Sequence, residues 1–481
     1  MGIFFLIAAL GCFVPLIVSM ARCFIRTPEA ISTPAWLLAA NALFILGGPV
    51  FVFLCFGEDL TGSSRGAAKV AAVLVAYSAV TFVSYWAFAR LANALNLSSF
   101  PVLSAVATLK KAADVIKPWE VFVWSIIVFA IQITAFSLYS LGLSGGTMAY
   151  DYKVNIPYGL LALYMLLGEA TLGLAALLAR IAFGHGKVNT RLFAGLLLLV
   201  EFGITVLSGR RELIWLTLAV TFGIIWSGRR KWVGALPFSV GFVYLVLFVF
   251  GPVFLRARVL YSGGNAPSVV DSYRIALGER ADEVTGKADF DAQKNMSWRF
   301  RTYVFWEELY EDRGGGFTEG KIIAQAALMM LPRLIFGFSK YGLGVVDENL
   351  LEVKFDICNN VSLESYIDIG VFGPVAYGVI FGAVFALSDG LIMWAGSRYR
   401  IMGVLAAGVM LRHLFGPEAN PIAYLSILRS CLIYAILASL IAILWGRKSL
   451  DPSIATRANS SLAKPRPAMA LTAIPASGWR L

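Results

Sequence analysis

Two arginines stand side by side in a tight turn between two apolar segments. Arg210 and Arg211 follow Ser208 and Gly209 and precede Glu212. Arginine carries a planar, permanently charged fork that matches the oxygens of phosphate groups. On the outer side of a membrane, where basic residues are disfavoured, such a pair predicts a phosphate-binding role. Contact with lipid headgroup phosphates, or pairing with Glu212, is the alternative.

A second group of arginines lies in the long polar segment from about 256 to 368. Arg299 and Arg301 begin an amphipathic stretch there. Residues two apart diverge by about 200° on a helix, so we expect one of the pair to face a site. The solvated face of an interfacial helix is the alternative. Trp298 and Trp306 fit stacking on sugar rings, or equally an aromatic belt at the membrane surface.

The same segment continues with an apolar pattern at helical spacing over residues 319–336. This pattern predicts an interfacial or re-entrant helix that covers a cavity. It ends near Arg333, and Lys340 follows. Both are further cationic candidates for binding an anionic substrate, as is Arg412 later in the chain, and Asn359 and Asn360 are candidates for substrate binding.

Two residues are candidates for a general base. Glu364 follows Asn359 and Asn360 where the polar segment enters an apolar span, and His413 follows Arg412 at the end of another span. A carboxylate or an imidazole can accept a proton from a hydroxyl within hydrogen-bond reach. Helix capping by the Asn or Glu side chains, and a structural role for the histidine, are the alternatives. The choice between Glu364 and His413 stays open at this stage.

Composition shows which kind of scaffold positions these groups. The chain has 481 residues, of which 59% are hydrophobic and 14% charged, and its mean hydropathy is +0.76. Soluble domains carry about 25% charged residues. Repeated apolar windows of about 20 residues therefore predict an all-α, polytopic membrane protein. Five scattered cysteines and two histidines indicate neither a disulfide framework nor a metal site.

About eleven transmembrane helices and one large folded outer loop are expected. The net charge of +11 gathers in short alternating loops, where Lys and Arg set topology, and is no nucleic-acid signature. The charge alternation places the N-terminus and the long loop outside. Residues 96–118 form a basic connection predicted to lie on the inner leaflet. The predicted spans are 2–21, 34–56, 67–89, 120–142, 159–182, 192–208, 212–227, 233–254, 367–394, 400–415 and 423–446.

These spans divide the chain into four parts. Residues 1–254 hold helices 1–8, residues 255–366 form the extracytoplasmic loop, and residues 367–449 hold helices 9–11. Residues 450–481 have no apolar periodicity and are expected to be a disordered cytoplasmic tail.

Polar groups inside the spans support a different function. Gln132, Glu169, Glu201 and Asp389 lie in apolar segments. Carboxylates are costly there and point to a water-lined path, a proton relay or pairing with arginine. They favour a lipid-linked oligosaccharide flippase or another secondary transporter. However, we see no repeated halves of the kind that transporters usually show.

The chain resembles the Wzy-type oligosaccharide repeat-unit polymerases of the O-antigen polymerase and ligase group. The likeness covers roughly residues 190–415. It rests on the turn 208–211, on Leu331-Pro332-Arg333 ahead of Lys340, and on Asn359-Asn360 with Glu364 running into Gly370-x-x-Gly373. The related ligases carry a His where this chain has Asn359, which argues against a ligase.

This resemblance implies an inverting glycosyl transfer that uses neither metal nor cofactor. A growing glycan would pass from polyprenyl pyrophosphate to a hydroxyl of a second lipid-linked repeat unit, outside the bacterial inner membrane. The family's outer arginines imply pyrophosphate contacts at Arg210 or Arg211 and at Arg299 or Arg301. Membrane lipids, a flippase and a chain-length regulator are the further expected partners. A non-catalytic scaffold subunit of an envelope assembly is a third hypothesis.

Overall fold

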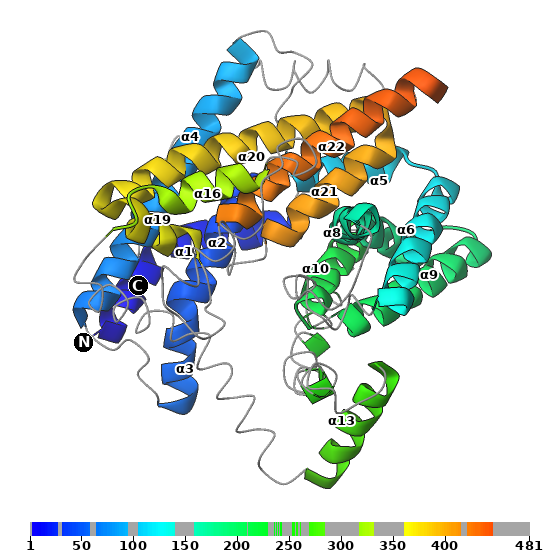
Figure 1. Cartoon of the computed structure of the whole chain (residues 1–481), viewed down its shortest axis with the longest axis horizontal. Coiled ribbons are helices and arrows are strands. Elements are labelled where there is room, and N and C mark those ends of the chain that lie inside the picture. The colour runs from blue at the N-terminus through cyan, green and yellow to red at the C-terminus, as the bar shows by residue number, and fades with distance from the viewer. Residues whose placement is uncertain are drawn as a thin grey trace, which may run out of the picture.

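The computed structural model is a bundle of helices (Figure 1). It describes residues 2–26, 31–57, 64–94, 104–139, 158–208, 210–228, ten separate positions between 235 and 260, 269–283, 317–330, 360–414 and 421–445. The helices before the long loop are α1 (Gly2–Arg26), α2 (Thr33–Asn41), the π-helix η2 (Ala42–Gly47), α3 (Gly48–Phe56), α4 (Ser64–Ala94), α5 (Ala105–Val115), α6 (Pro118–Tyr139), α8 (Tyr158–Phe183), α9 (Val188–Ser208) and α10 (Arg210–Trp226). Those that follow are α13 (Val269–Glu283), α16 (Lys321–Met330), α19 (Val361–Ile369), the short 3₁₀-helix η5 (Gly370–Phe372), α20 (Gly373–Arg398), α21 (Arg400–Leu414) and α22 (Pro421–Trp445).

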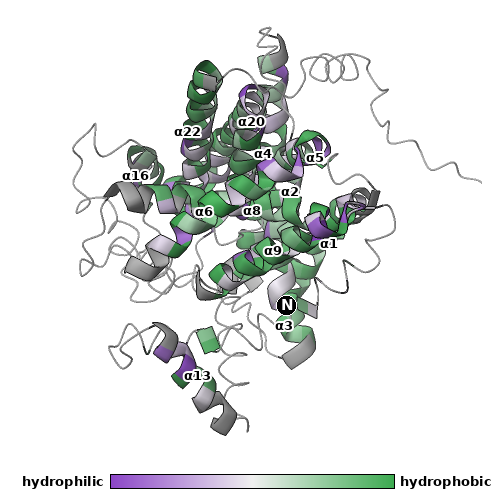
Figure 2. Cartoon of the chain, turned by 90° about the vertical axis from the view of Figure 1, so that its right-hand side faces the viewer, coloured by the Kyte–Doolittle hydropathy of each residue, from purple (hydrophilic) through white to green (hydrophobic). Residues whose placement is uncertain are grey.

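Seven of the described helical segments are long and apolar enough to cross a membrane. Two shorter apolar helices, Pro118–Thr134 and Leu213–Trp226, accompany them. Most helices of the bundle are coloured as hydrophobic, whereas α13 carries several hydrophilic positions (Figure 2). The prediction of an all-α polytopic membrane protein is therefore confirmed. The count of eleven spans stays a prediction, and the span expected at 233–254 lies almost wholly outside the described residues.

The short helix α21 occupies the centre of the bundle. Its side chains are buried almost without interruption from Ile401 to Leu411, and it packs against α8, α20, α22 and α5. A helix that is apolar all round belongs in such a position. At the crossing with α8, a Cβ on Gly408 would lie 2.4 Å from the Ala170 carbonyl oxygen, and one on Gly173 would lie 2.2 Å from that of Val404. The two backbones touch here because glycine has no side chain to hold them apart.

A buried carboxylate ties four helices together at one end of the bundle. Asp389 on α20 accepts hydrogen bonds from Thr33 Oγ1 (2.6 Å), Tyr85 Oη (2.7 Å) and the Ala105 amide (3.1 Å). Thr33 begins α2, Tyr85 belongs to α4, and Ala105 begins α5. The carboxylate thus receives three donors and the favourable dipoles of two helix N-termini. Asp389 therefore has a structural role, because it links α20 to α2, α4 and α5.

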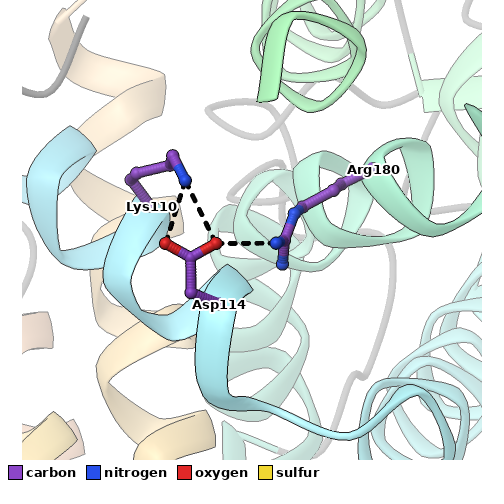
Figure 3. A network of polar contacts seen from close by, with 3 residues as sticks. All are labelled: Lys110, Asp114 and Arg180. Carbon is purple, nitrogen blue, oxygen red and sulfur yellow. Dashed lines mark hydrogen bonds and ion pairs between the residues drawn. The ribbon is translucent and has the colours of Figure 1, made fainter. Parts of the chain in front are cut away.

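The helix α5 covers protein where the sequence predicted contact with lipid. Its apolar face, including Ala105, Val106, Leu109 and Ala112, is buried against α8, α20 and α21. On its polar face, Asp114 accepts from Lys110 at 2.9 Å and from Arg180 of α8 at 2.6 Å (Figure 3). These charges are partly exposed, so the network contributes little stability but holds α5 against α8.

The predicted span 367–394 is divided at its N-terminal end. α19 ends at Ile369, η5 follows, and α20 begins at Gly373. Gly370 adopts φ 66°, a left-handed conformation that side chains disfavour, and a Cβ on Gly373 would lie 1.7 Å from the Ser365 carbonyl oxygen. The glycine pair therefore lets α19 fold back closely on the start of α20.

Candidate functional site

The structure brings three charged or titratable side chains together between α8 and α21. Arg412 Nη1 lies 3.8 Å from Glu169 Oε1, and His413 Nε2 lies 4.0 Å from the same oxygen. The side chains are 27%, 14% and 12% exposed for Arg412, Glu169 and His413. In the described part of the chain, His413 Nε2 has no hydrogen-bond partner. The imidazole is thus close enough to respond to the carboxylate without being bonded to it.

The local geometry of α8 and α21 follows from their sequences. α21 crosses α8 at Gly173 and Gly408, with residue 173 beside 404 and residue 170 beside 408. This order is antiparallel. One further turn along each helix places Glu169 opposite Arg412. The close glycine crossing therefore sets the distance between the two charges.

Two residues from neighbouring helices complete this site. The Arg412 guanidinium carbon lies 4.8 Å from the centre of the Trp215 ring on α10, an arrangement that favours the cation. Arg429 on α22 is exposed, and its charge acts on Glu169. We name Glu169, Trp215, Arg412, His413 and Arg429 the Arg412 cluster.

The charge of the Arg412 cluster suits an anion. Two permanent cations stand against one carboxylate, with an imidazole that adds a further charge when protonated. Arg429 lies about two turns and Glu169 about three turns inside apolar helices. Charges at that depth are costly unless they line a water-filled space or hold one another. A phosphate-bearing ligand would bring the anionic charge that this cluster lacks.

Sequence reasoning found part of this cluster. It named Arg412 and His413 as site residues and Glu169 as a buried polar group. However, it assigned the arginine to the transferase site and the carboxylate to the transporter hypothesis. Trp215 and Arg429 were missed. A lone arginine inside the 25-residue apolar helix Pro421–Trp445 was a signal that could have found Arg429. Nothing in the sequence distinguishes Trp215 from other aromatic residues of the bundle.

The other candidate base lies on a different helix. Glu364 is 2% exposed in the first turn of α19, which packs mainly against α20, α4 and α16. Asn360 precedes it as the N-cap, and its side-chain oxygen accepts from the Ser362 amide at 2.9 Å. Its amide nitrogen donates to Asn41 Oδ1 at 3.5 Å. Helix capping, left open by the sequence, is therefore what Asn360 does here.

Asp368, one turn beyond Glu364, organises the start of α16. It accepts from the amides of Ile322 and Ile323, each at 3.1 Å. The Tyr377 hydroxyl donates to it at 2.6 Å and the Thr318 hydroxyl makes a further bond. Since four donors satisfy this buried carboxylate, it anchors the start of α16.

The arginine turn is placed in part. Arg210 and Arg211 begin α10, and their side chains lie outside the described residues. Close by, the Tyr273 hydroxyl of α13 donates to the Val206 carbonyl at 3.0 Å. Burial raises the pKa of Tyr273, in keeping with a hydroxyl held against the end of α9. The helix α13 therefore attaches beside the turn.

Seven predicted site residues fall outside the part of the chain that the structure describes. They are Trp298, Arg299, Arg301, Trp306, Arg333, Lys340 and Asn359. Their roles stay predictions. Within the described residues, no three His, Cys, Asp or Glu side chains converge as metal ligands.

Comparison with protein-family models, with curated proteins and with solved structures finds no match to this chain. A functional proposal for this chain therefore rests on its sequence and on the Arg412 cluster.

Proposed function

We propose that this chain is a membrane glycosyltransferase that polymerises lipid-linked oligosaccharide repeat units. It transfers a growing glycan from polyprenyl pyrophosphate to a hydroxyl of a second lipid-linked repeat unit, on the outer face of a bacterial inner membrane. The observation that carries the proposal is the Arg412 cluster, in which a guanidinium inside the bundle lies over Trp215 and beside Glu169.

The chemistry of the leaving group supports this assignment. Departure of a glycan from polyprenyl pyrophosphate leaves a multiply charged anion, and fixed cations that stabilise it lower the barrier. Arg412 is positioned by an aromatic ring and a carboxylate before any ligand binds. Arg429 offers a second cation from another helix, so one pyrophosphate group can be contacted from two sides.

The acceptor hydroxyl needs a group that takes its proton. Of the two bases predicted from sequence, His413 adjoins Arg412, whereas Glu364 belongs to α19. We therefore assign the base to His413. Glu169, whose Oε1 lies 4.0 Å from His413 Nε2, stabilises the imidazolium that forms. Arg412 therefore stabilises the leaving group, and His413 accepts the proton of the attacking hydroxyl.

A reconstituted reaction tests the proposal. The purified protein in lipid receives a polyprenyl-pyrophosphate-linked repeat unit, and the products are separated by size. We expect a ladder of lengthened glycans, lost in Arg412→Ala and His413→Ala. Arg398→Ala is the matched control. The Arg398 guanidinium carbon also lies near a tryptophan, 5.4 Å from the centre of the Trp394 ring. However, Arg398 is at the end of α20, away from the Arg412 cluster.

Two outcomes would contradict the proposal. One is a full ladder from Arg412→Ala protein. The other is a wild-type protein that leaves every repeat unit at its original length.

A lipid-linked oligosaccharide flippase is the second candidate. It is favoured by the position of the Glu169–Arg412 pair inside the bundle, where transporters hold coupling residues. Movement of unextended repeat units between leaflets, blocked by Glu169→Gln, would support this function over the transferase.

A further inference from the structure

Three of the carboxylates within the described apolar helices have different surroundings: Glu169, Glu201 and Asp389. Asp389 receives three hydrogen bonds, and Glu169 pairs with Arg412. Glu201 on α9 differs from both. It is 2% exposed, and in the described part of the structure its Oε2 atom has no hydrogen-bond partner. A buried polar atom without a partner calls for an explanation.

A second orphan oxygen lies in the same seam between α6, α8 and α9. Gln132 on α6 is 6% exposed, and its Oε1 has no partner among the described residues. Its Nε2 would lie 3.7 Å from a Cβ on Gly168 of α8. Glu201 is hydrogen-bonded to Thr171, which is one turn from Gly168. Both orphan oxygens therefore belong to side chains that lie against one turn of α8.

Thr171 lies between two acceptors. Its hydroxyl is 3.0 Å from the Gly168 carbonyl oxygen, and it also makes a hydrogen bond with Glu201 that stabilises the carboxylate. A hydroxyl has one hydrogen, so it satisfies only one of these acceptors at a time. In neither case does Glu201 Oε2 gain a donor, and it has none among the described residues.

The helices packed around Glu201 direct no described cation at it. On α8, Glu169 is turned about 100° from Gly168 and about 200° from Thr171 and faces Arg412 on the other side of the helix. The other titratable or charged groups on the adjoining elements lie toward helix ends or on α13: Glu120 at the start and Tyr139 at the end of α6, Tyr158 and Tyr164 in the first two turns of α8, Arg180 near its end, Arg191 at the start of α9, Arg210, Arg211 and Glu212 at the start of α10, and Tyr273 on α13.

We propose that Glu201 is a proton-binding site within the membrane, where the neutral acid donates its hydrogen to Gln132 Oε1. One proton then satisfies both orphan oxygens. It also removes the large cost of an ionised carboxylate in an apolar seam. Glu201 can ionise only when water or a cation enters between α6 and α9, so the seam carries a proton in its closed state. The site is separate from the Arg412 cluster and does not depend on the proposed transferase.

Labelling with a hydrophobic carbodiimide tests the proposal, because this reagent modifies neutral carboxyl groups in apolar surroundings. The full-length protein in lipid is treated across a pH series, and the adducts are located by peptide mass spectrometry. We expect an adduct on Glu201 that declines as the pH rises. The exposed Glu319 and the fully hydrogen-bonded Asp389 serve as internal controls that stay unlabelled.

A variant and a competing ion complete the test. Glu201→Gln has the shape of the neutral acid and can donate to Gln132, so it should fold and unfold at the wild-type temperature while it loses the adduct. A Glu201→Gln protein that unfolds well below wild type would overturn the proposal, because it would mean that the charge is needed. Absence of the adduct at acidic pH would overturn it too. Protection of Glu201 by sodium at constant pH would assign the site to a metal cation instead.

Discussion

The Arg412 guanidinium on α21 lies 3.8 Å from the Glu169 carboxylate on α8. The two helices reach this distance because Gly408 and Gly173 let their backbones touch about one turn away. A charge pair and a glycine crossing are therefore one structural unit. It can be altered at the glycines without changing either charge.

Separating α8 from α21 should strongly reduce the proposed glycan transfer while leaving every charged residue in place. In Gly408→Val, the new side chain meets the Ala170 carbonyl, which forces the helices apart and draws Arg412 away from Glu169. We expect the ladder of lengthened glycans to fall at least tenfold. Gly195→Val is the matched control, since a Cβ at Gly195 meets nothing within 4 Å. Equal product lengths from Gly408→Val and Gly195→Val would show that the crossing does not position the cluster.

Removal of the Asp389 carboxylate should destabilise the bundle. Asp389→Ala leaves Thr33, Tyr85 and the Ala105 amide without their acceptor, and each buried unsatisfied donor costs about 1–3 kcal/mol. We expect a clear fall in the unfolding temperature of the purified protein. Ser388→Ala is the adjacent control, because the buried Ser388 hydroxyl has no partner among the described residues and should cost little. If Asp389→Ala unfolds at the same temperature as Ser388→Ala, Asp389 does not have this structural role.

Hydropathy predicted the fold class because burial in lipid requires long apolar helices whatever their packing. Hydropathy could not tell which partner, if any, each buried carboxylate has. Glu169, Glu201 and Asp389 look alike in the sequence, since each stands alone in an apolar segment. Their partners come from helices distant in the chain: Arg412 for Glu169, and Thr33 with Tyr85 for Asp389. A partner that is set by tertiary packing leaves no local signal.

The glycines also show that contacts between distant helices leave no local signal in the sequence. The sequence shows Gly370 and Gly373 at the start of a span, and the structure packs the backbone closely there. The sequence does not mark Gly173 and Gly408 in this way, which form a contact between two helices rather than within one junction. For α5, the sequence indicated a basic connection on the inner leaflet, but it does not say whether the apolar face of this helix meets lipid or protein.

Stability should depend on pH through Lys111 of α5. Burial lowers the pKa of this lysine. The unfolded lysine titrates near 10.4, so at neutral pH both states are charged and the folded state carries the whole desolvation cost. That cost disappears as the pH rises through the lowered folded pKa. Lys111→Met should therefore raise the unfolding temperature at pH 7, and the gain should shrink toward pH 10.

The exposed Lys117 provides the comparison for this measurement. Lys117→Met should change the unfolding temperature little at either pH. A Lys111→Met protein that is less stable than wild type at pH 7 would mean that the ammonium group has a favourable partner.

Gly370 should tolerate no side chain, for two separable reasons. Its φ of 66° strains any other residue by about 1–2 kcal/mol, and a Cβ would lie 2.9 Å from the Phe317 ring. Gly57 has a similar φ of 72° with open space around it. Gly57 has ψ 6°, whereas Gly370 has ψ −143°, in a region that only glycine adopts readily. Gly57→Ala therefore reports the cost of a positive φ without a clash, and Gly370→Ala should lower the unfolding temperature further. Adding Phe317→Ala to Gly370→Ala should recover the part due to the ring; if it recovers nothing, the ring does not constrain the junction between α19 and α20.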